Sequence, residues 1–142
     1  MSATVQVTFD AADPAALAAF WSGALGYVSD PPPEGFASWE AWATDQGIPE
    51  ERWNDASAIV DPDGAGPRIF FQKVPEGKAA KNRVHLDVRA APGLDGDARW
   101  ARLREEAERL VAAGATKLYE LEERGSFWIT MQDPEGNEFC LD

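Results

Sequence analysis

The sequence predicts an α+β fold in which two βαβββ modules form one curved, mixed, open barrel-like sheet with helices on its outer face. Three observations predict this fold: short segments that alternate apolar and polar side chains, two amphipathic helices, and a turn sequence that occurs twice in matching places. The 142 residues fit a single domain, with module one at about 1–75 and module two at about 82–142.

The first module is expected to open with a strand followed by a helix. Residues 4–10 alternate apolar and polar side chains, which is the period of a strand with two different faces. Asp13 and Pro14 are typical of a helix N-cap and a first helical position, and Gly26 is typical of a helix end. The helix between them carries an apolar stripe at i, i+3, i+4 and i+7: Leu17, Phe20, Trp21 and Ala24.

Turn-forming residues separate this helix from the later strands of the module. Residues 29–37 are rich in proline and predict a loop, and residues 38–53 predict one or two short helices. Strands are expected at 56–60 and 68–72, with the turn sequence Asp-Pro-Asp-Gly at 61–64 between them.

The second module repeats this order. A helix from about Asp97 to Gly114 buries an apolar stripe formed by Trp100, Leu103, Ala107, Leu110 and Val111. The turn sequence returns at 133–136 as Asp-Pro-Glu-Gly. Strands are expected at 83–89, 117–122, 127–132 and 138–141.

The composition excludes several kinds of partner. The chain has 25 acidic and 13 basic side chains and a net charge of −12, so it would repel nucleic acid and anionic membrane surfaces.

Cys140 is the only cysteine, which excludes a disulfide within the chain. The sequence shows no leader and no long apolar run, so we expect a cytoplasmic protein.

Strand alternation predicts which side chains share the concave face. The apolar phase should point toward the helices: Val5, Val7, Phe9, Ile69, Phe71, Val84, Leu86, Val88, Phe139 and Leu141. The other phase should share the free face: Gln6, Thr8, Arg68, Phe70, Gln72, Arg83, His85, Asp87, Glu138 and Cys140. This mixture favours a small-molecule pocket covered by Trp39 and Trp42 over an ordinary solvated sheet face.

The chain resembles a known superfamily. The order of elements, the motifs at 20–21 and 24–27 and the ending at 133–140 resemble the vicinal oxygen chelate superfamily, which includes glyoxalase I, bleomycin-resistance proteins and extradiol dioxygenases. Segments 71–76 and 81–87 are similar to glyoxalase-like domains that occur as small bacterial proteins. The resemblance covers nearly the whole chain and implies its fold more specifically than its reaction.

The resemblance implies one divalent metal in the concave face, held by the first and last strands of each module. Carried over by position, Gln6 and His85 fall on two ligand sites. Cys140 stands where a glutamate is expected, and Glu138 lies two residues before it on the same face. The implied metal ligands are therefore Gln6, His85 and Glu138, with zinc, nickel, manganese or iron as the candidate ion.

Two departures limit the reactions that the resemblance implies. The remaining ligand site falls on Phe70 or Gln72, so two of the four positions lack the expected carboxylate. The single histidine, His85, excludes the iron site of extradiol dioxygenases, which needs two histidines and a carboxylate. The superfamily also implies a homodimer.

Two functions stay open at this point. The first is a glyoxalase-like lyase or isomerase that acts on a small carbonyl-bearing or anionic metabolite, with His85 and Glu138 as catalytic residues. The second is a non-catalytic protein of the bleomycin-resistance type that sequesters a small molecule. Either function would use the same binding residues: Gln6, Thr8, Phe70, Gln72, Arg83, Asp87, Trp39, Trp42 and Cys140.

Overall fold

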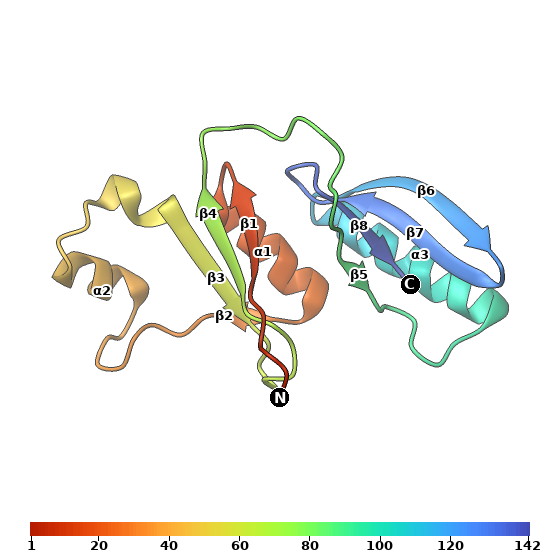
Figure 1. Ribbon diagram of the computed structural model, residues 1–142, viewed down its shortest axis with the longest axis horizontal. Helices are drawn as coiled ribbons and strands as arrows, with labels where there is room; N and C mark the ends of the chain where they lie inside the picture. The colour runs from red at the N-terminus through yellow and green to blue at the C-terminus, as the bar shows by residue number, and fades with distance from the viewer. The chain divides into compact units, whose positions relative to one another are not determined.

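Two units with the same order of elements make up the computed structural model, which describes residues 1–142 (Figure 1). The first unit comprises residues 1–77 and the second comprises residues 78–142. Each unit forms its own four-stranded mixed, open sheet, where the sequence predicts one sheet for both. The α+β class and the repeated strand–helix–three-strand order are confirmed.

The first unit forms a sheet with the strand order β1-β4-β3-β2. Strand β1 pairs in parallel with β4, and the other pairs are antiparallel. Its elements are β1 (Val7–Ala11), α1 (Pro14–Leu25), β2 (Val28–Ser29), α2 (Trp39–Asp45), the 3-10 helix η1 (Glu50–Asp55), β3 (Ala56–Val60) and β4 (Ile69–Lys73).

Helix α1 begins and ends where the sequence predicts. The side chain of Asp13 accepts a hydrogen bond from the backbone N–H of Ala16 at 3.2 Å, and Gly26 ends the helix with a left-handed φ of 71°. The ring of Trp21 on α1 lies 5.4 Å from that of Phe9, which in turn lies 5.3 Å from that of Phe71. These aromatic contacts attach α1 to the apolar face of the sheet.

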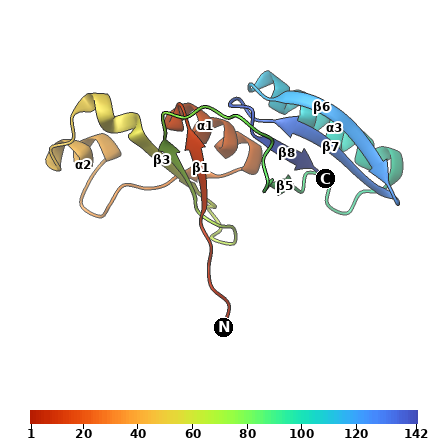
Figure 2. The same ribbon diagram turned by 45° about the horizontal axis from the view of Figure 1, so that its top comes forward.

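The second unit has the equivalent strand order β5-β8-β7-β6, again with one parallel pair, β5 with β8. Its elements are β5 (Asp87–Val88), α3 (Gly96–Ala112), β6 (Thr116–Glu123), β7 (Ser126–Gln132) and β8 (Glu138–Leu141). Figure 2 shows α3 along one face of this sheet. The core between them is fully buried and consists of Leu103, Leu110, Ile129, Met131, Phe139 and Leu141. No helix of either unit is long and apolar enough to cross a bilayer.

Three apolar residues that the sequence predicts in the core are exposed instead. Val5 precedes β1 and is 72% exposed, and Val84 precedes the two-residue β5 and is 81% exposed. Val84 lies between β5 and Asn82, whose backbone N–H donates to the side chain of Glu138 and not to a strand backbone. Val111 is 46% exposed because it lies at the margin of the helix face that covers the sheet.

The two Asp-Pro turns have the same internal hydrogen bonds. Asp61 accepts from the backbone N–H of Asp63 at 2.9 Å, and Asp133 accepts from that of Glu135 at 2.9 Å. Each turn joins the last two strands of its unit. The aspartate side chain replaces backbone partners that a turn leaves unpaired, which explains why the motif occurs at both positions.

A two-residue turn closes the β6–β7 hairpin. Arg124 and Gly125 both have left-handed backbone angles, with φ values of 51° and 79°. This is the geometry of a type I′ turn, which matches the twist of the strands that it joins and usually contains Asn-Gly. Arg124 is the only residue other than glycine with a positive φ.

Truncation of Phe71 tests the alternation of β4. Phe71 is fully buried, so Phe71→Ala should lower the free energy of unfolding by about 3–5 kcal/mol through lost burial and a cavity. The matched variant Phe70→Ala lies on the opposite face and should lower it by less than half as much. Urea denaturation followed by circular dichroism measures both; equal losses would show that the strand faces are assigned wrongly.

Candidate functional site

Arg68 connects the polar side chains on the free face of the first unit, the sheet face opposite α1. Its Nη1 donates to Gln6 Oε1 at 2.8 Å, and its Nε donates to Asp30 Oδ2 at 2.9 Å. Its guanidinium carbon lies 5.4 Å from the ring centroid of Phe70, a cation–π distance. Gln6 Nε2 lies 3.4 Å from Thr8 Oγ1, to which it donates. These contacts join three of the predicted binding residues.

Three further contacts involve residues near this face. Gln72 Nε2 donates to Asp10 Oδ1 at 2.8 Å, and the parallel register of β1 and β4 pairs the same two residues. On α2, the rings of Trp39 and Trp42 meet edge to face at 5.5 Å, and Trp39 Nε1 donates to the carbonyl oxygen of Asp30 at 2.7 Å. The role of these tryptophans as a cover for a ligand stays a prediction.

Strands β5 and β8 bring an imidazole, a carboxylate and a thiol together in the second unit. Their parallel register pairs Asp87 with Cys140. His85 Nδ1 lies 2.9 Å from Asp87 Oδ1, and one ligand atom from each of the three side chains lies within 4.8 Å of the others. The side chains of His85 and Asp87 are 45% and 46% exposed, so a small molecule can reach them.

Cys140 is a neutral thiol in this environment. Burial raises its pKa, and the carboxylates of Asp87 and Asp142 raise it further by disfavouring a thiolate nearby. Thr130 Oγ1 lies 3.6 Å from the sulfur, and this hydrogen bond acts in the opposite direction without overcoming the other effects. A thiol with a raised pKa is a poor nucleophile at neutral pH unless a cation compensates for the lost proton.

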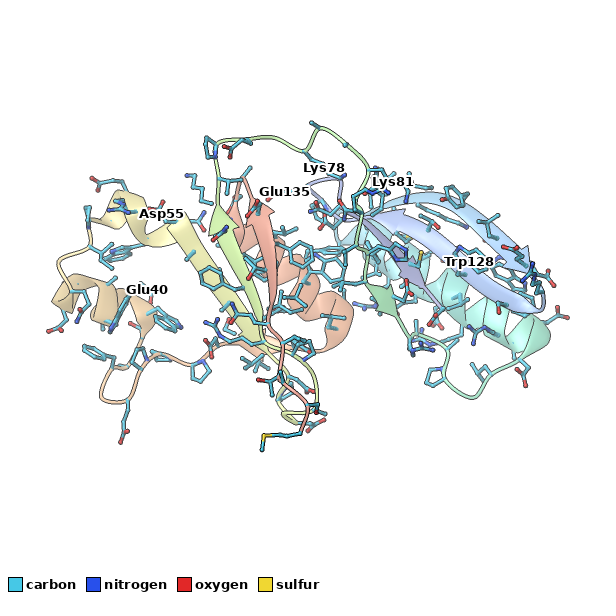
Figure 3. The ribbon with its side chains drawn as sticks, viewed as in Figure 1. Glu40, Asp55, Lys78, Lys81, Trp128 and Glu135 are labelled. Atoms are coloured by element: carbon cyan, nitrogen blue, oxygen red, sulfur yellow. The ribbon has the colours of Figure 1, made fainter.

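Glu138 is held by the loop that precedes β5. The backbone N–H of Asn82 donates to Glu138 Oε2 at 2.9 Å, and Lys78 Nζ lies 3.1 Å from the same oxygen. Burial tends to raise the pKa of this carboxyl, which is 12% exposed, but the Asn82 bond and the Lys78 charge outweigh it and the pKa is lowered. Figure 3 shows Lys78 together with Lys81 on this loop. Glu138 is therefore an ionised anchor and a weak base.

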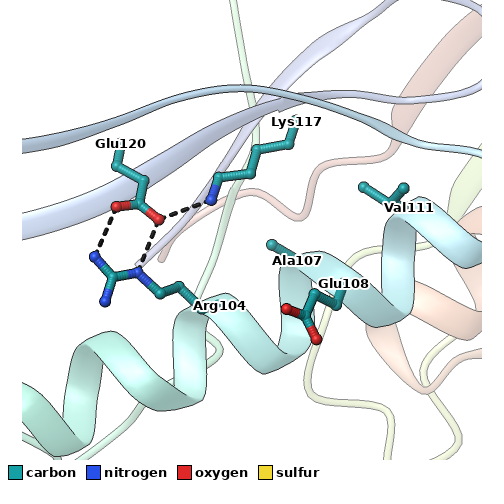
Figure 4. Close-up of a pocket in the computed structure, with 6 residues that line it drawn as sticks. All are labelled: Arg104, Ala107, Glu108, Val111, Lys117 and Glu120. Carbon is teal, nitrogen blue, oxygen red and sulfur yellow. Dashed lines mark hydrogen bonds and ion pairs between the residues drawn. The ribbon is translucent and has the colours of Figure 1, made fainter.

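A groove lies on the other side of the same unit, between α3 and β6 (Figure 4). It has a volume of about 290 Å³. Glu120 accepts two hydrogen bonds from Arg104 at 2.9 and 2.8 Å and one from Lys117 at 2.7 Å. The Arg104 and Lys117 bonds lower the pKa of Glu120 to about 2. Because Glu120 already pairs with both cations, the groove offers no free cation to an anionic ligand.

The structure divides the predicted site residues between the two units. Gln6, Thr8, Phe70, Gln72, Trp39 and Trp42 belong to the first unit, and Arg83, His85, Asp87, Glu138 and Cys140 belong to the second. The predicted metal ligands Gln6, His85 and Glu138 therefore come from both units, and that set stays a prediction. Within the second unit, the structure groups His85 with Asp87 and Cys140, and groups Glu138 with Lys78 and Asn82.

The sequence analysis did not identify three residues that contact predicted site residues in the structure. Asp10 continues the alternation of Gln6 and Thr8 and could have been found from it. Thr130 lies in the free-face phase of a strand that was predicted, so the same argument would have found it. Asn82 carries no such signal, because its bond to Glu138 joins residues 56 positions apart.

Comparison with known families and structures agrees with the fold. A family model described as the glyoxalase-like domain matches residues 6–141, nearly the whole chain. No curated protein sequence matches the chain.

Solved structures with this fold cover almost all of the chain. A glyoxalase/bleomycin resistance protein/dioxygenase family enzyme from Burkholderia phytofirmans is 15% identical, with a TM-score of 0.57, and the match covers 97% of this chain and 94% of that chain. A glyoxalase-related enzyme from Fulvimarina pelagi is 16% identical, with a TM-score of 0.59 and coverages of 99% and 87%. At these identities the likeness shows the fold alone.

A third solved structure contains a metal. It is a variant of the fosfomycin resistance protein FosX from Listeria monocytogenes in complex with Mn(II) and 1S,2S-dihydroxypropylphosphonic acid. It is 14% identical to this chain, with a TM-score of 0.61, and the match covers 99% of this chain and 89% of that chain.

The raised pKa of Cys140 predicts slow alkylation. In metal-free protein at pH 7, iodoacetamide should modify Cys140 more slowly than a free exposed cysteine, whose pKa is about 8.5, and the rate should still rise above that pH. Asp87→Asn removes a neighbouring negative charge and should speed the reaction at a fixed pH. Mass spectrometry follows the single thiol directly. Fast alkylation at pH 7 that does not rise with pH would contradict the assignment.

The lowered pKa of Glu138 predicts a pH-dependent contribution to stability. Its carboxylate stabilises the fold above the unfolded pKa of about 4.3, and this contribution is lost as pH falls through the lower folded pKa. Glu138→Gln should therefore reduce the free energy of unfolding by about 1–2 kcal/mol at pH 7, with a smaller difference from wild type at pH 3. The exposed Glu122→Gln is the control. A difference that is constant with pH would refute the linkage.

Proposed function

Because this chain belongs to the glyoxalase-like domain family, we propose that it is a lyase or isomerase for a small carbonyl-bearing or anionic metabolite. In this proposal, His85 is the central acid–base group, and the free faces of the sheets supply the binding residues. The family fold hosts several chemistries, so the proposal depends on the side chains of this chain.

The observation that carries the proposal is the contact between His85 and Asp87. A carboxylate 2.9 Å from Nδ1 favours the tautomer with the proton on that nitrogen, which leaves Nε2 free to accept a proton from a substrate. Asp87 also stabilises the imidazolium that forms after such a transfer. Both side chains are nearly half exposed, so the imidazole is open to a bound molecule.

The charges around this pair support an anionic substrate. The chain is strongly acidic overall, yet Lys78, Lys81 and Arg83 follow one another closely on the loop before β5. Lys78 is paired with Glu138, whereas Lys81 is close enough to Cys140 for its charge to lower the pKa of the thiol. Lys81 and Arg83 are both exposed, so we assign to them the attraction of an anionic group toward His85.

The donor set of the second unit also fits a divalent metal. His85, Asp87 and Cys140 would hold it, because their ligand atoms already lie within 4.8 Å of one another. When bound there, a metal would polarise a carbonyl oxygen or lower the pKa of a bound water. In the metal-free site, Asp87 orients the imidazole and His85 accepts the proton at Nε2. A metal bound through Nε2 would replace that proton, and His85 would then act as a ligand.

Replacement of His85 tests the proposal. Wild-type protein, incubated with a panel of 2-oxoaldehydes, 2-oxo acids and small phosphonates, should convert at least one of them, with the products identified by NMR. His85→Ala should lower kcat/KM for that compound by about 10²–10⁴-fold, the usual contribution of a general acid or base. The exposed Glu122→Gln should retain full activity.

Two other results would each overturn this proposal. Tight one-to-one binding of a panel compound without conversion, measured by quenching of tryptophan fluorescence, would make the chain a sequestering protein. Conversion that is unaffected by His85→Ala, in a variant with an unchanged circular dichroism spectrum, would assign the chemistry to other residues.

A further inference from the structure

The cluster of His85, Asp87 and Cys140 combines nitrogen, oxygen and sulfur ligand atoms, and this combination favours some divalent metals over others. The three side chains come from residues around β5 and from β8, and the parallel register of these strands fixes Asp87 beside Cys140. The cluster offers one imidazole nitrogen, one carboxylate oxygen and one sulfur, all within 4.8 Å. Ligand atoms that share one tetrahedral zinc ion lie about 3.3–3.8 Å apart, so side-chain movements of about 1 Å would bring this cluster to coordination distance.

The sulfur decides which ion such a cluster prefers. Manganese and magnesium favour sites made of oxygen ligands, whereas thiolate and imidazole suit zinc and cobalt. Asp87 is the only carboxylate of the cluster, so oxygen supplies one of the three protein ligands. Three protein ligands leave a fourth tetrahedral position for water or substrate, which is typical of catalytic rather than structural zinc sites.

The surroundings of the sulfur provide a second, independent argument. Thr130 is 6% exposed, and its Oγ1 lies 3.6 Å from the sulfur of Cys140. When Cys140 coordinates a metal, its thiol proton passes to solvent. The sulfur can then only accept in its contact with Thr130, so the Thr130 hydroxyl must be the donor. A buried hydroxyl that donates to a metal-bound thiolate is the kind of outer contact that orients ligands in metal sites.

We infer that His85, Asp87 and Cys140 form a divalent-metal site that binds zinc or cobalt in preference to manganese, with Cys140 as a thiolate ligand and Thr130 as its positioning residue. The inference deepens the proposed function, because the same cluster carries it. Its test, however, uses the metal alone and needs no substrate.

Cobalt titration tests the inference. Full-length protein without a histidine tag is stripped with a chelator and titrated with Co²⁺. A sulfur-to-cobalt charge-transfer band in the near ultraviolet should grow to one equivalent and disappear on addition of zinc, but not of an equal amount of Mn²⁺. Cys140→Ser should abolish the band, and His85→Ala and Asp87→Asn should weaken cobalt binding by more than about 100-fold, beyond the usual effect of an outer-shell change.

Two further variants separate ligation from packing. Thr130→Val should keep the band but weaken cobalt binding by about 10–100-fold. Glu122→Gln, on the exposed face of β6, should bind cobalt as wild type does. Circular dichroism of each variant confirms that it is folded.

Several results would overturn the inference. These are no stoichiometric cobalt binding, cobalt binding without the charge-transfer band, equal affinity in folded Cys140→Ser protein, or displacement by manganese as readily as by zinc. Failure of the proposed function can be distinguished from failure of this inference, because a protein that converts no panel compound would still show the cobalt band.

Discussion

The alternation of side chains along β-strands is the constraint on which both units depend. In each unit one helix covers one sheet face, and the side chains that point toward it are fully buried, as Phe71 and Phe139 are. The burial of these residues fixes the register of their strands, because a shift by one position would expose every apolar side chain. The opposite face is then free for polar groups, and its residues can serve chemistry without weakening the core.

The free faces of the two units contain different chemistry on equivalent frameworks. In the first unit Arg68 is fully engaged by Gln6 and Asp30, so its charge orders the face. In the second unit the equivalent region carries an exposed imidazole, His85, just before β5, and a half-buried thiol, Cys140, on β8. The repeated Asp-Pro turns join the last two strands of each unit in the same way, whereas α2 and η1 occur only in the first unit.

Most of the local structure could be predicted from the sequence, and long-range contacts explain the rest. The Asp13 cap and the Gly26 end predict α1 because each acts within a few residues. Alternation also places His85, Asp87 and Cys140 on one face, but only the pairing of β5 with β8 makes them neighbours. The strand predicted at 83–89 is formed only at Asp87–Val88, and local alternation gives no sign of the bond between Asn82 and the distant Glu138 just before it.

The turn at Arg124 has a consequence for how the second sheet assembles. An arginine with a φ of 51° opposes its own backbone preference by about 1–2 kcal/mol, so this turn costs free energy that other contacts must offset. The cross-strand contacts of β6 and β7, and the docking of α3 on them, must supply the driving force. The stability of this hairpin therefore comes from its packed strands and not from its loop.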